Sequence, residues 1–238
     1  MKKFMILSLV LLFTYAGSAM AGVLYSDATG DVIVPGSPFP HIDIASVDVS
    51  NTATDLIFKI NLSGDPIATD WGKYMVGIDS AAGGDPAGNG WGRPIGMSSG
   101  MDFWLGSWAD SGNGLELRNW NGSSWGLQAA SYNAIPPLAT PTKTNSSISL
   151  TVPLNYLGLG VGSTFLFDVY TSGGGGGDGA VDALGNPNPS ISDWGNAYNS
   201  GSNVQSYTVI PEPATFTLIA LSSVLASIGL AAKRSRSV

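Results

Sequence analysis

The sequence predicts an all-β protein, built as a single β-sandwich or jelly roll with long glycine-rich loops. Short segments of alternating polar and apolar residues recur along the middle of the chain, with the period of a half-buried strand. Glycine (32 residues) and proline (14 residues) separate these segments, and only 11% of the 238 residues are charged. No long amphipathic helix pattern lies between the two ends of the chain.

Residues 1–21 have the composition of a secretory signal peptide and predict an N-terminal signal helix. Two lysines precede the apolar run Phe4–Tyr15. Ala19 and Ala21 are the small residues that signal peptidase reads, so cleavage is predicted before Gly22. The alternative is an uncleaved anchor helix, for which the apolar run is short.

The C-terminus predicts one transmembrane helix. Residues 214–232 form a run of 19 uncharged residues, which as a helix spans roughly 28 Å, close to the thickness of the hydrocarbon core. The motif Pro211, Glu212 and Pro213 comes before this run. A basic tail of Lys233, Arg234 and Arg236 follows it and is expected to stay on the cytoplasmic side.

This order of Pro-Glu-Pro, hydrophobic span and basic tail over residues 210–238 resembles the PEP-CTERM sorting signal. The resemblance implies cleavage by a membrane protease-transpeptidase, an exosortase, in a Gram-negative-type cell that makes exopolysaccharide. The protein would be exported, held in the membrane by its C-terminal helix before processing, and then found at the cell surface or outside the cell. The alternative is an ordinary tail anchor in which the motif is incidental.

Residues 22–209 are expected to form the sandwich domain. Its strands are predicted at residues 42–49, 55–62, 73–79, 101–108, 115–120, 125–130, 147–152, 164–170 and 204–209. A short helical turn is predicted at residues 153–157, and a hairpin turn at residues 121–124. The glycine-rich stretches 80–100 and 172–201 are predicted to be surface loops.

The charge of the domain excludes one class of partner. Removing both ends takes away one acid and five bases, which leaves 16 acids and five bases, a net charge of about −11. Nucleic-acid binding needs clustered Lys and Arg, so no nucleic-acid partner is expected. The chain has no cysteine, so disulfides do not stabilise it.

Three aspartates near the start of the domain are candidate calcium ligands. Asp27 and Asp31 are four residues apart in a tight loop, and Asp43 stands at the edge of the next strand. Hard cations bind several carboxylate and carbonyl oxygens on loop backbone. The alternative is that these aspartates bond their own turns. Asp178 and Asp182 are a weaker second pair.

The same segment carries a second resemblance. Asp27-Ala-Thr-Gly-Asp31, followed by Asp43-Ile and an alternating strand pair, is similar to the start of DOMON-like domains, which include family-nine carbohydrate-binding modules. The resemblance covers about the first 50 residues of the domain. It implies a carbohydrate-binding β-sandwich with a calcium ion near this loop.

The domain is rich in tryptophan, which can bind sugars by stacking against their apolar C–H faces. The seven tryptophans are Trp71, Trp91, Trp104, Trp108, Trp120, Trp125 and Trp194. Trp91 lies in a glycine-rich loop, and Trp104 and Trp108 share strand parity, so these three are the candidate glycan-binding residues. The alternative for each is packing in the core or against a hairpin neighbour.

No catalytic pattern is evident. His41 is the only histidine, there is no nucleophile elbow, and Glu116 is the only glutamate of the domain. We therefore expect no enzyme activity, and a non-catalytic module that binds exopolysaccharide is the first hypothesis. The second is a structural matrix or surface protein that binds no glycan, and the third is a glycan hydrolase.

Overall fold

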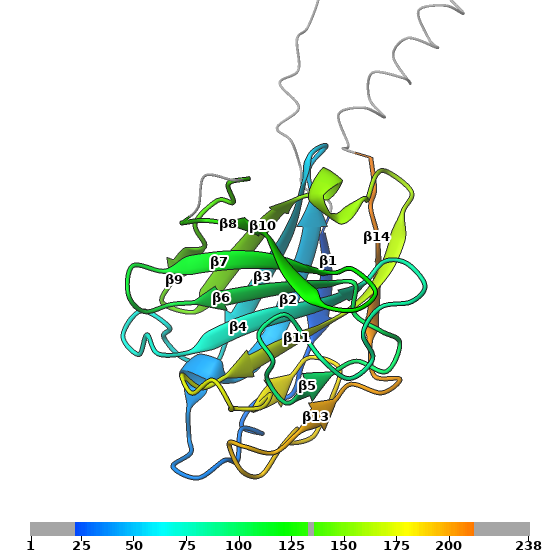
Figure 1. Cartoon of the computed structure of the whole chain (residues 1–238). Helices are drawn as coiled ribbons and strands as arrows, with labels where there is room; N and C mark the ends of the chain where they lie inside the picture. Colours follow the sequence, from blue (N-terminus) through cyan, green and yellow to red (C-terminus); the bar gives the residue numbers. More distant parts are fainter. Residues whose placement is uncertain (1–21, 133–135, 212–238) are drawn as a thin grey trace, which may run out of the picture. The chain divides into compact units, whose positions relative to one another are not determined.

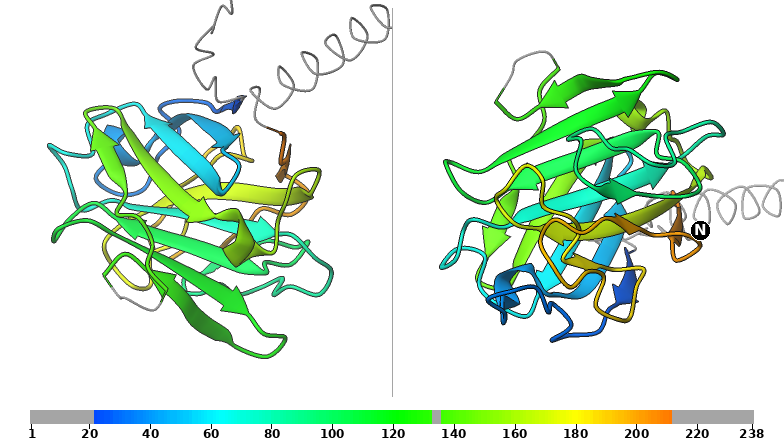
Figure 2. Two further views of the ribbon diagram at one scale, coloured as in Figure 1. Left: turned by 90° about the horizontal axis from the view of Figure 1, so that it is seen from above. Right: turned by 60° about the horizontal axis from the view of Figure 1, so that its bottom comes forward.

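The computed structural model describes residues 22–132 and 136–211, and within them the chain is nearly all β (Figure 1). Two open sheets lie face to face, as in a sandwich (Figure 2). The described helical pieces are two single turns, η1 (Pro40–Ile42) and η2 (Leu154–Leu157). The second of these coincides with the predicted turn, and the all-β fold class is confirmed.

The first sheet has five strands, and all its neighbouring strands are antiparallel. In pairing order they are β1 (Gly22–Ser26), β2 (Ile44–Asn51), β3 (Asp55–Leu62), β10 (Ser147–Pro153) and β9 (Thr142–Thr144). Strand β3 alternates as its sequence predicts, because Leu56, Phe58 and Ile60 are fully buried while Lys59 is exposed. One face of this sheet is therefore turned to the core.

The second sheet has seven strands and is also antiparallel. In pairing order they are β12 (Asp182–Ala183), β11 (Thr164–Ser172), β4 (Lys73–Asp79), β6 (Phe103–Trp108), β7 (Gly114–Trp120) and β8 (Trp125–Ala130), with β14 (Gln205–Thr208) also paired to β11. The predicted hairpin joins β7 to β8. Its turn is fixed by the Asn121 side chain, whose Oδ1 accepts backbone hydrogen bonds from Ser123 and Ser124.

The main hydrophobic core lies between the inner faces of the two sheets. Phe58 of β3 packs edge-on against Phe167 of β11, with 5.5 Å between the ring centroids. Tyr25 of β1 contacts the same Phe167 ring at 5.2 Å. Each large side chain buried in this way contributes about 1.5–3 kcal/mol, so packing supplies the stability that disulfides do not.

The two glycine-rich stretches are surface loops, but they also cover the outer face of the second sheet. Each contributes one strand of a small parallel pair, β5 (Ile95–Gly96) with β13 (Tyr198–Asn199). Tyr170 points outward from β11 and is nevertheless fully buried. A Cβ at Gly77 on β4 would lie 2.6 Å from the Met101 sulfur, so only glycine leaves space there for the Met101 side chain. A second, smaller core thus lies under the loops.

Gly22 and Ile210, near the two ends of the described domain, both lie next to the end of β2. Gly22 of β1 is opposite Ser50 in the sheet register. The next residue, Asn51, donates a hydrogen bond to the carbonyl of Ile210 (2.8 Å) and accepts one from its N–H (3.0 Å). Tyr207 of β14 also donates its hydroxyl to Asn51 Oδ1, at 2.7 Å. The chain therefore enters and leaves the domain at one place.

The predicted signal segment 1–21, with Ala19 and Ala21, and the predicted membrane helix 214–232 lie outside the described residues. Also outside them are Glu212, Pro213, Lys233, Arg234 and Arg236. Gly22 opens β1, and Pro211 follows the last residue held by Asn51. Within residues 22–132 and 136–211, no helix has the length and apolar character needed to cross a membrane.

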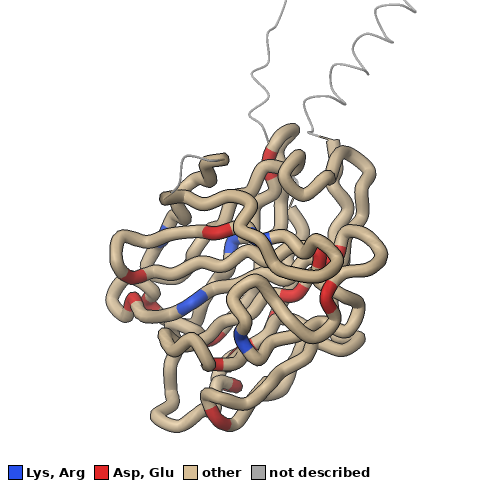
Figure 3. Tube along the Cα trace, viewed as in Figure 1, with Lys and Arg blue, Asp and Glu red and all other residues tan. Residues whose placement is uncertain are grey.

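Charge is distributed unevenly over the domain. Acidic positions are scattered along the chain, and basic positions are few (Figure 3). The described residues contain two ion pairs, Lys73 with Asp110 (3.1 Å) and Arg118 with Glu116 (2.9 Å). Both lie on the outer face of the second sheet, on or next to its strands β4, β6 and β7.

Candidate functional site

Four aspartates gather at the end of the sandwich opposite to Gly22 and Ser50, and we call them the aspartate cluster: Asp27, Asp31, Asp43 and Asp182. Asp27 directly follows β1, Asp43 directly precedes β2, and Asp182 belongs to β12 of the other sheet. Carboxylate oxygens of Asp31, Asp43 and Asp182 all lie within 4.8 Å of one another, and all three residues are buried. The cluster thus joins the two sheets.

Several oxygens of the cluster are buried without a hydrogen-bond partner. Both carboxylate oxygens of Asp31 are in this state, as are Oδ1 of Asp43 and Oδ2 of Asp27. The other oxygens accept backbone N–H groups, for example that of Ile44, which lies 2.6 Å from Oδ2 of Asp182. Neither ion pair of the described residues includes a member of the cluster. Buried, unpaired carboxylates are costly unless a proton or a cation neutralises them.

The pKa values of the cluster also favour a bound cation. Burial raises the pKa of Asp27 to about 8, and the charges of Asp31 and Asp43 add to the rise. Burial also raises the pKa of Asp182 well above its ordinary value, with the charge of Asp27 adding to it. The aspartates therefore resist being ionised together without a counter-charge. The donor set, all oxygen and partly unsatisfied, fits a hard divalent cation such as Ca²⁺.

The predicted calcium ligands Asp31 and Asp43 come together, and Asp27 lies close enough for its charge to act on Asp182. The predicted second pair does not form as a separate site. Asp182 joins the first cluster, while Asp178 stays in the glycine loop and accepts the N–H of Gly175. Sequence spacing gave no sign of this, because Asp182 reaches the cluster through the pairing of β12 with β11.

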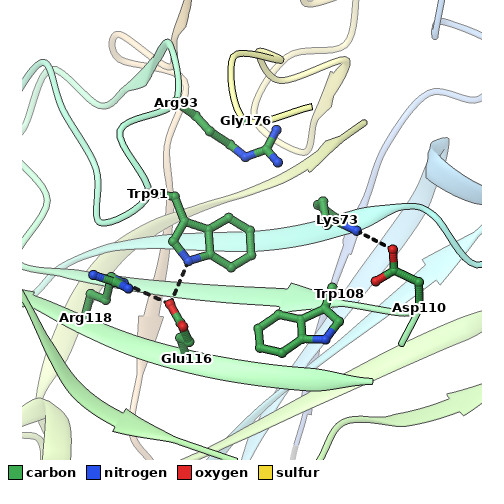
Figure 4. Close-up of a pocket in the computed structure, with 8 residues that line it drawn as sticks. All are labelled: Lys73, Trp91, Arg93, Trp108, Asp110, Glu116, Arg118 and Gly176. Atoms are coloured by element: carbon green, nitrogen blue, oxygen red, sulfur yellow. Dashed lines mark hydrogen bonds and ion pairs between the residues drawn. The ribbon is translucent and has the colours of Figure 1, made fainter. Parts of the chain in front are cut away.

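A second candidate site is a hollow of about 340 Å³ on the outer face of the second sheet, which we call the Trp91 pocket (Figure 4). Its lining residues are Lys73, Trp91, Arg93, Trp108, Asp110, Glu116, Arg118 and Gly176. The strands supply Lys73, Trp108, Glu116 and Arg118, and the covering loops supply Trp91, Arg93 and Gly176. Its volume falls in the range of small-ligand sites.

The two indole rings of the pocket pack against glycines of the strands. A Cβ at Gly106 would lie 2.2 Å from the Trp91 ring, and one at Gly114 would lie 2.0 Å from the Trp108 ring. The rings therefore lie against bare backbone. Their centroids are 6.4 Å apart and their planes are inclined by 42°. Two aromatic faces held at a fixed angle form a preorganised apolar wall.

Glu116 holds the polar side of the pocket in place. Its Oε2 accepts the indole N–H of Trp91 and Nε of Arg118, each at 2.9 Å, and its Oε1 accepts the Tyr132 hydroxyl. Burial alone would raise the pKa of Glu116, but these hydrogen bonds and the Arg118 charge outweigh it and lower the pKa. Glu116 is thus a carboxylate that accepts hydrogen bonds from three donors.

One candidate glycan-binding residue needs correction. Trp104 shares its outward parity with Trp108, as predicted, but it is fully buried. It lies beneath Trp91, with centroids 6.2 Å apart, and stacks on Tyr170 at 6.0 Å. The covering loop closes over this position, so Trp104 packs in the second core and offers no surface to a ligand.

Sequence reasoning also missed an aromatic groove, here called the Trp71 groove, of about 510 Å³. Its lining residues are Pro35, Phe39, Trp71, Gly173, Gly174, Gly175, Asp178 and Trp194. Trp71 lies 5.4 Å from Phe39 and 6.0 Å from Trp194, and its ring also covers buried His41 at 4.3 Å. The same glycine run lines this groove and, through Gly176, the Trp91 pocket.

Comparison with known proteins adds no assignment: no family model matches the chain, and no curated protein is significantly similar to it. The resemblances to PEP-CTERM signals and to DOMON-like domains therefore stay predictions.

Proposed function

We propose that residues 22–211 form a non-catalytic, exported module that binds extracellular or cell-surface polysaccharide in the Trp91 pocket. The observation that carries the proposal is the fixed pair of Trp91 and Trp108 rings beside charged groups. Sugar rings present apolar C–H faces that pack on indoles, and hydroxyls that bond carboxylates and cations. Both rings remain partly exposed, so a ligand can reach them.

The chemistry of Glu116 favours binding over hydrolysis. A glycosidase needs a carboxylic acid whose pKa is raised, so that it can protonate the leaving oxygen. The pKa of Glu116 is lowered instead, because its carboxylate accepts hydrogen bonds from three donors and lies beside the Arg118 charge. The second acid, Asp110, pairs with Lys73 at 3.1 Å. We infer that these acids orient neighbouring groups and do not act in catalysis.

The aspartate cluster would hold one calcium ion through Asp31, Asp43 and Asp182, with Asp27 beside them. Bound there, the ion would act structurally. It would neutralise the buried carboxylates and connect the start of β2 in one sheet to β12 in the other. The hydrogen bond from Ile44 N–H to Asp182 already spans the same junction. This cofactor supports the fold and takes no part in a reaction.

Export and sorting complete the proposal. Signal peptidase would cut before Gly22, and an exosortase would process the chain near Pro211 after a period of membrane anchoring. The domain would then stay at the cell surface or in the extracellular matrix, in contact with exopolysaccharide. The compact unit formed by residues 21–211 is consistent with this division.

A structural matrix or surface protein without glycan binding is the second candidate. The observation that favours it is the edge strand β1, which pairs on one side with β2. Val23 and Leu24 on this strand are 43% and 63% exposed. An apolar, open edge can add a strand from another protein.

Titration of the purified domain 22–211 with a panel of bacterial and plant polysaccharides, followed by tryptophan fluorescence, tests the proposal. These residues hold a complete core and form one compact unit. We expect saturable binding that Trp108→Ala weakens about tenfold or more. Trp120→Ala is the matched control, since Trp120 pairs with Trp125 on the hairpin outside the pocket. A folded domain that binds no glycan would favour the matrix protein.

A further inference from the structure

The basic residues of this acidic domain converge on one place. The domain has five bases against 16 acids, and three of the five, Lys73, Arg93 and Arg118, line the Trp91 pocket. The other two are Lys59 on the first sheet and Lys143 in β9. Figure 3 shows how sparse the basic positions are elsewhere. Such a concentration of positive charge sets the pocket apart from the rest of the domain.

The charges inside the pocket do not cancel. Lys73 pairs with Asp110, and Arg118 pairs with Glu116, which uses both acids of the lining. Arg93 takes part in neither of the two ion pairs found among the described residues. The pocket therefore keeps one positive charge in excess, and Arg93 carries it.

Arg93 is held in the wall of the pocket by neutral groups only. It is 6% exposed, and it donates hydrogen bonds to the Ser172 hydroxyl (2.8 Å) and to the backbone carbonyls of Asp178 (3.1 Å) and Gly173 (3.3 Å). Its guanidinium carbon also lies 5.6 Å from the centroid of the Trp91 ring. These contacts fix the direction of the guanidinium without neutralising it.

A buried guanidinium without a carboxylate is costly, and burial lowers the pKa of Arg93 for this reason. The charge of Asp178 acts on Arg93 and partly offsets this, but the Asp178 carboxylate forms no ion pair with the guanidinium among the described residues. A ligand that brings its own carboxylate to the pocket would supply the missing partner in charge-assisted hydrogen bonds.

We propose that the Trp91 pocket selects acidic polysaccharide, by binding the carboxylate of a uronic acid residue at Arg93 while its ring packs on Trp91 and Trp108. This inference rests on the proposed glycan-binding function and names the ligand class of that site. A neutral sugar would fill the same apolar wall and leave Arg93 unpaired, so the pocket discriminates against it.

The test compares two ligands that have the same sugar rings, one with free carboxylates and one with neutral methyl esters. Domain 22–211 is titrated with trigalacturonate and with its trimethyl ester, at one fixed concentration of free Ca²⁺, by isothermal titration calorimetry. We expect the acid to bind about tenfold or more tightly than the ester, the size of effect that a charged hydrogen bond gives. We also expect this preference to shrink as salt is raised.

Three variants test whether Arg93 is the source of this preference. Arg93→Gln should bring the affinities for acid and ester close together, and Arg93→Lys, which keeps the charge, should retain part of the preference. Lys59→Gln removes an equal charge from an exposed position on the first sheet and should leave the preference unchanged. If Arg93→Gln fails to fold, the comparison of acid with ester on the unaltered domain still decides the question.

Each outcome has a distinct meaning. Equal affinity for acid and ester, or binding of neutral glycans alone, would overturn the selection of uronic acids and leave the glycan-binding function standing. No binding to any glycan would overturn both. A preference for acid that survives unchanged in Arg93→Gln would overturn the role of Arg93.

Discussion

The indole N–H of Trp91 donates a hydrogen bond of 2.9 Å to Oε2 of Glu116. Trp91 comes from a glycine-rich loop, whereas Glu116 belongs to strand β7 of the second sheet. The bond therefore fixes a loop residue to the sheet, and the bare backbone of Gly106 supports the other side of the ring. A pocket wall built in this way needs little ordering when a ligand arrives.

Gly106→Ala should displace Trp91. The added Cβ would lie 2.2 Å from the ring, so the indole has to leave the sheet. We expect a loss of about 1–3 kcal/mol in the free energy of unfolding, a changed fluorescence spectrum and much weaker glycan binding. Gly126→Ala on β8 of the same sheet is the control, because its Cβ would make an ordinary contact of 3.5 Å with Asn119. Unaltered binding by Gly106→Ala would contradict this account of the ring.

Removal of calcium should destabilise the domain. At a Ca²⁺ concentration of 100 times Kd, binding adds about 2.7 kcal/mol, so a chelator should lower Tm by about 5–10 °C. Asp31→Asn removes a buried charge whose two oxygens have no other partner, and should abolish the response to chelator. Asp193→Asn, at an exposed position outside the cluster, should respond as the unaltered domain does. Equal Tm values with calcium and with chelator would exclude the site.

The buried Asp168 should make stability depend on pH. Burial raises its pKa to about 7, despite hydrogen bonds from Ser200, Gly185 and Val169. Below pH 3.8 the folded and unfolded chains both keep this proton, and between about pH 4 and 7 only the folded chain does. The free energy of unfolding should therefore fall as pH rises through this window, by at most about 1.4 kcal/mol per pH unit, and level off above it.

Asp168→Asn checks this dependence. An asparagine can accept the same two backbone N–H groups at Oδ1 and donate from Nδ2 to the Ser200 hydroxyl, so the fold should persist. Urea unfolding in calcium-containing buffer between pH 4 and 8 should give a flatter profile for the variant. Parallel profiles for the two proteins would show that Asp168 is ionised throughout.

Asn51 should hold the C-terminal strand. Its side chain bonds both backbone groups of Ile210 and accepts the Tyr207 hydroxyl. Asn51→Ala should cost about 2 kcal/mol or more and speed hydrogen exchange in residues 205–210. Tyr207→Phe removes one of these bonds and should have a smaller effect. Equal exchange in Asn51→Ala and the unaltered domain would show that β14 is held by its pairing with β11 alone.

Strands with clear alternation could be predicted from the sequence. All nine predicted strands are present, and their ends differ from the prediction by no more than two residues. The strands that escaped prediction are β1, β9 and three strands of two residues each. β1 (GVLYS) has no polar–apolar alternation, and the shortest strands exist only because distant segments meet.

The sites were predictable in part. Asp27, Asp31 and Asp43 are close in sequence and share a local loop, so their grouping left a visible pattern. Asp182 lies about 140 residues further on and joins them through sheet pairing, which residue spacing does not show. Parity predicted that Trp104 and Trp108 lie on the same face of β6, which they do, but it carries no information on a loop that folds back over the sheet and buries Trp104.

Gly22 and Ile210 both lie next to β2, and this has a consequence for how the domain can be attached. Gly22 lies beside Ser50, and Ile210 lies beside Asn51. A tether attached at either end would therefore hold the domain in the same orientation. The polypeptide path is close to a ring, which a short peptide between these two residues would complete. New ends could then be opened in an exposed loop, such as that around Gly176, with little change to either sheet.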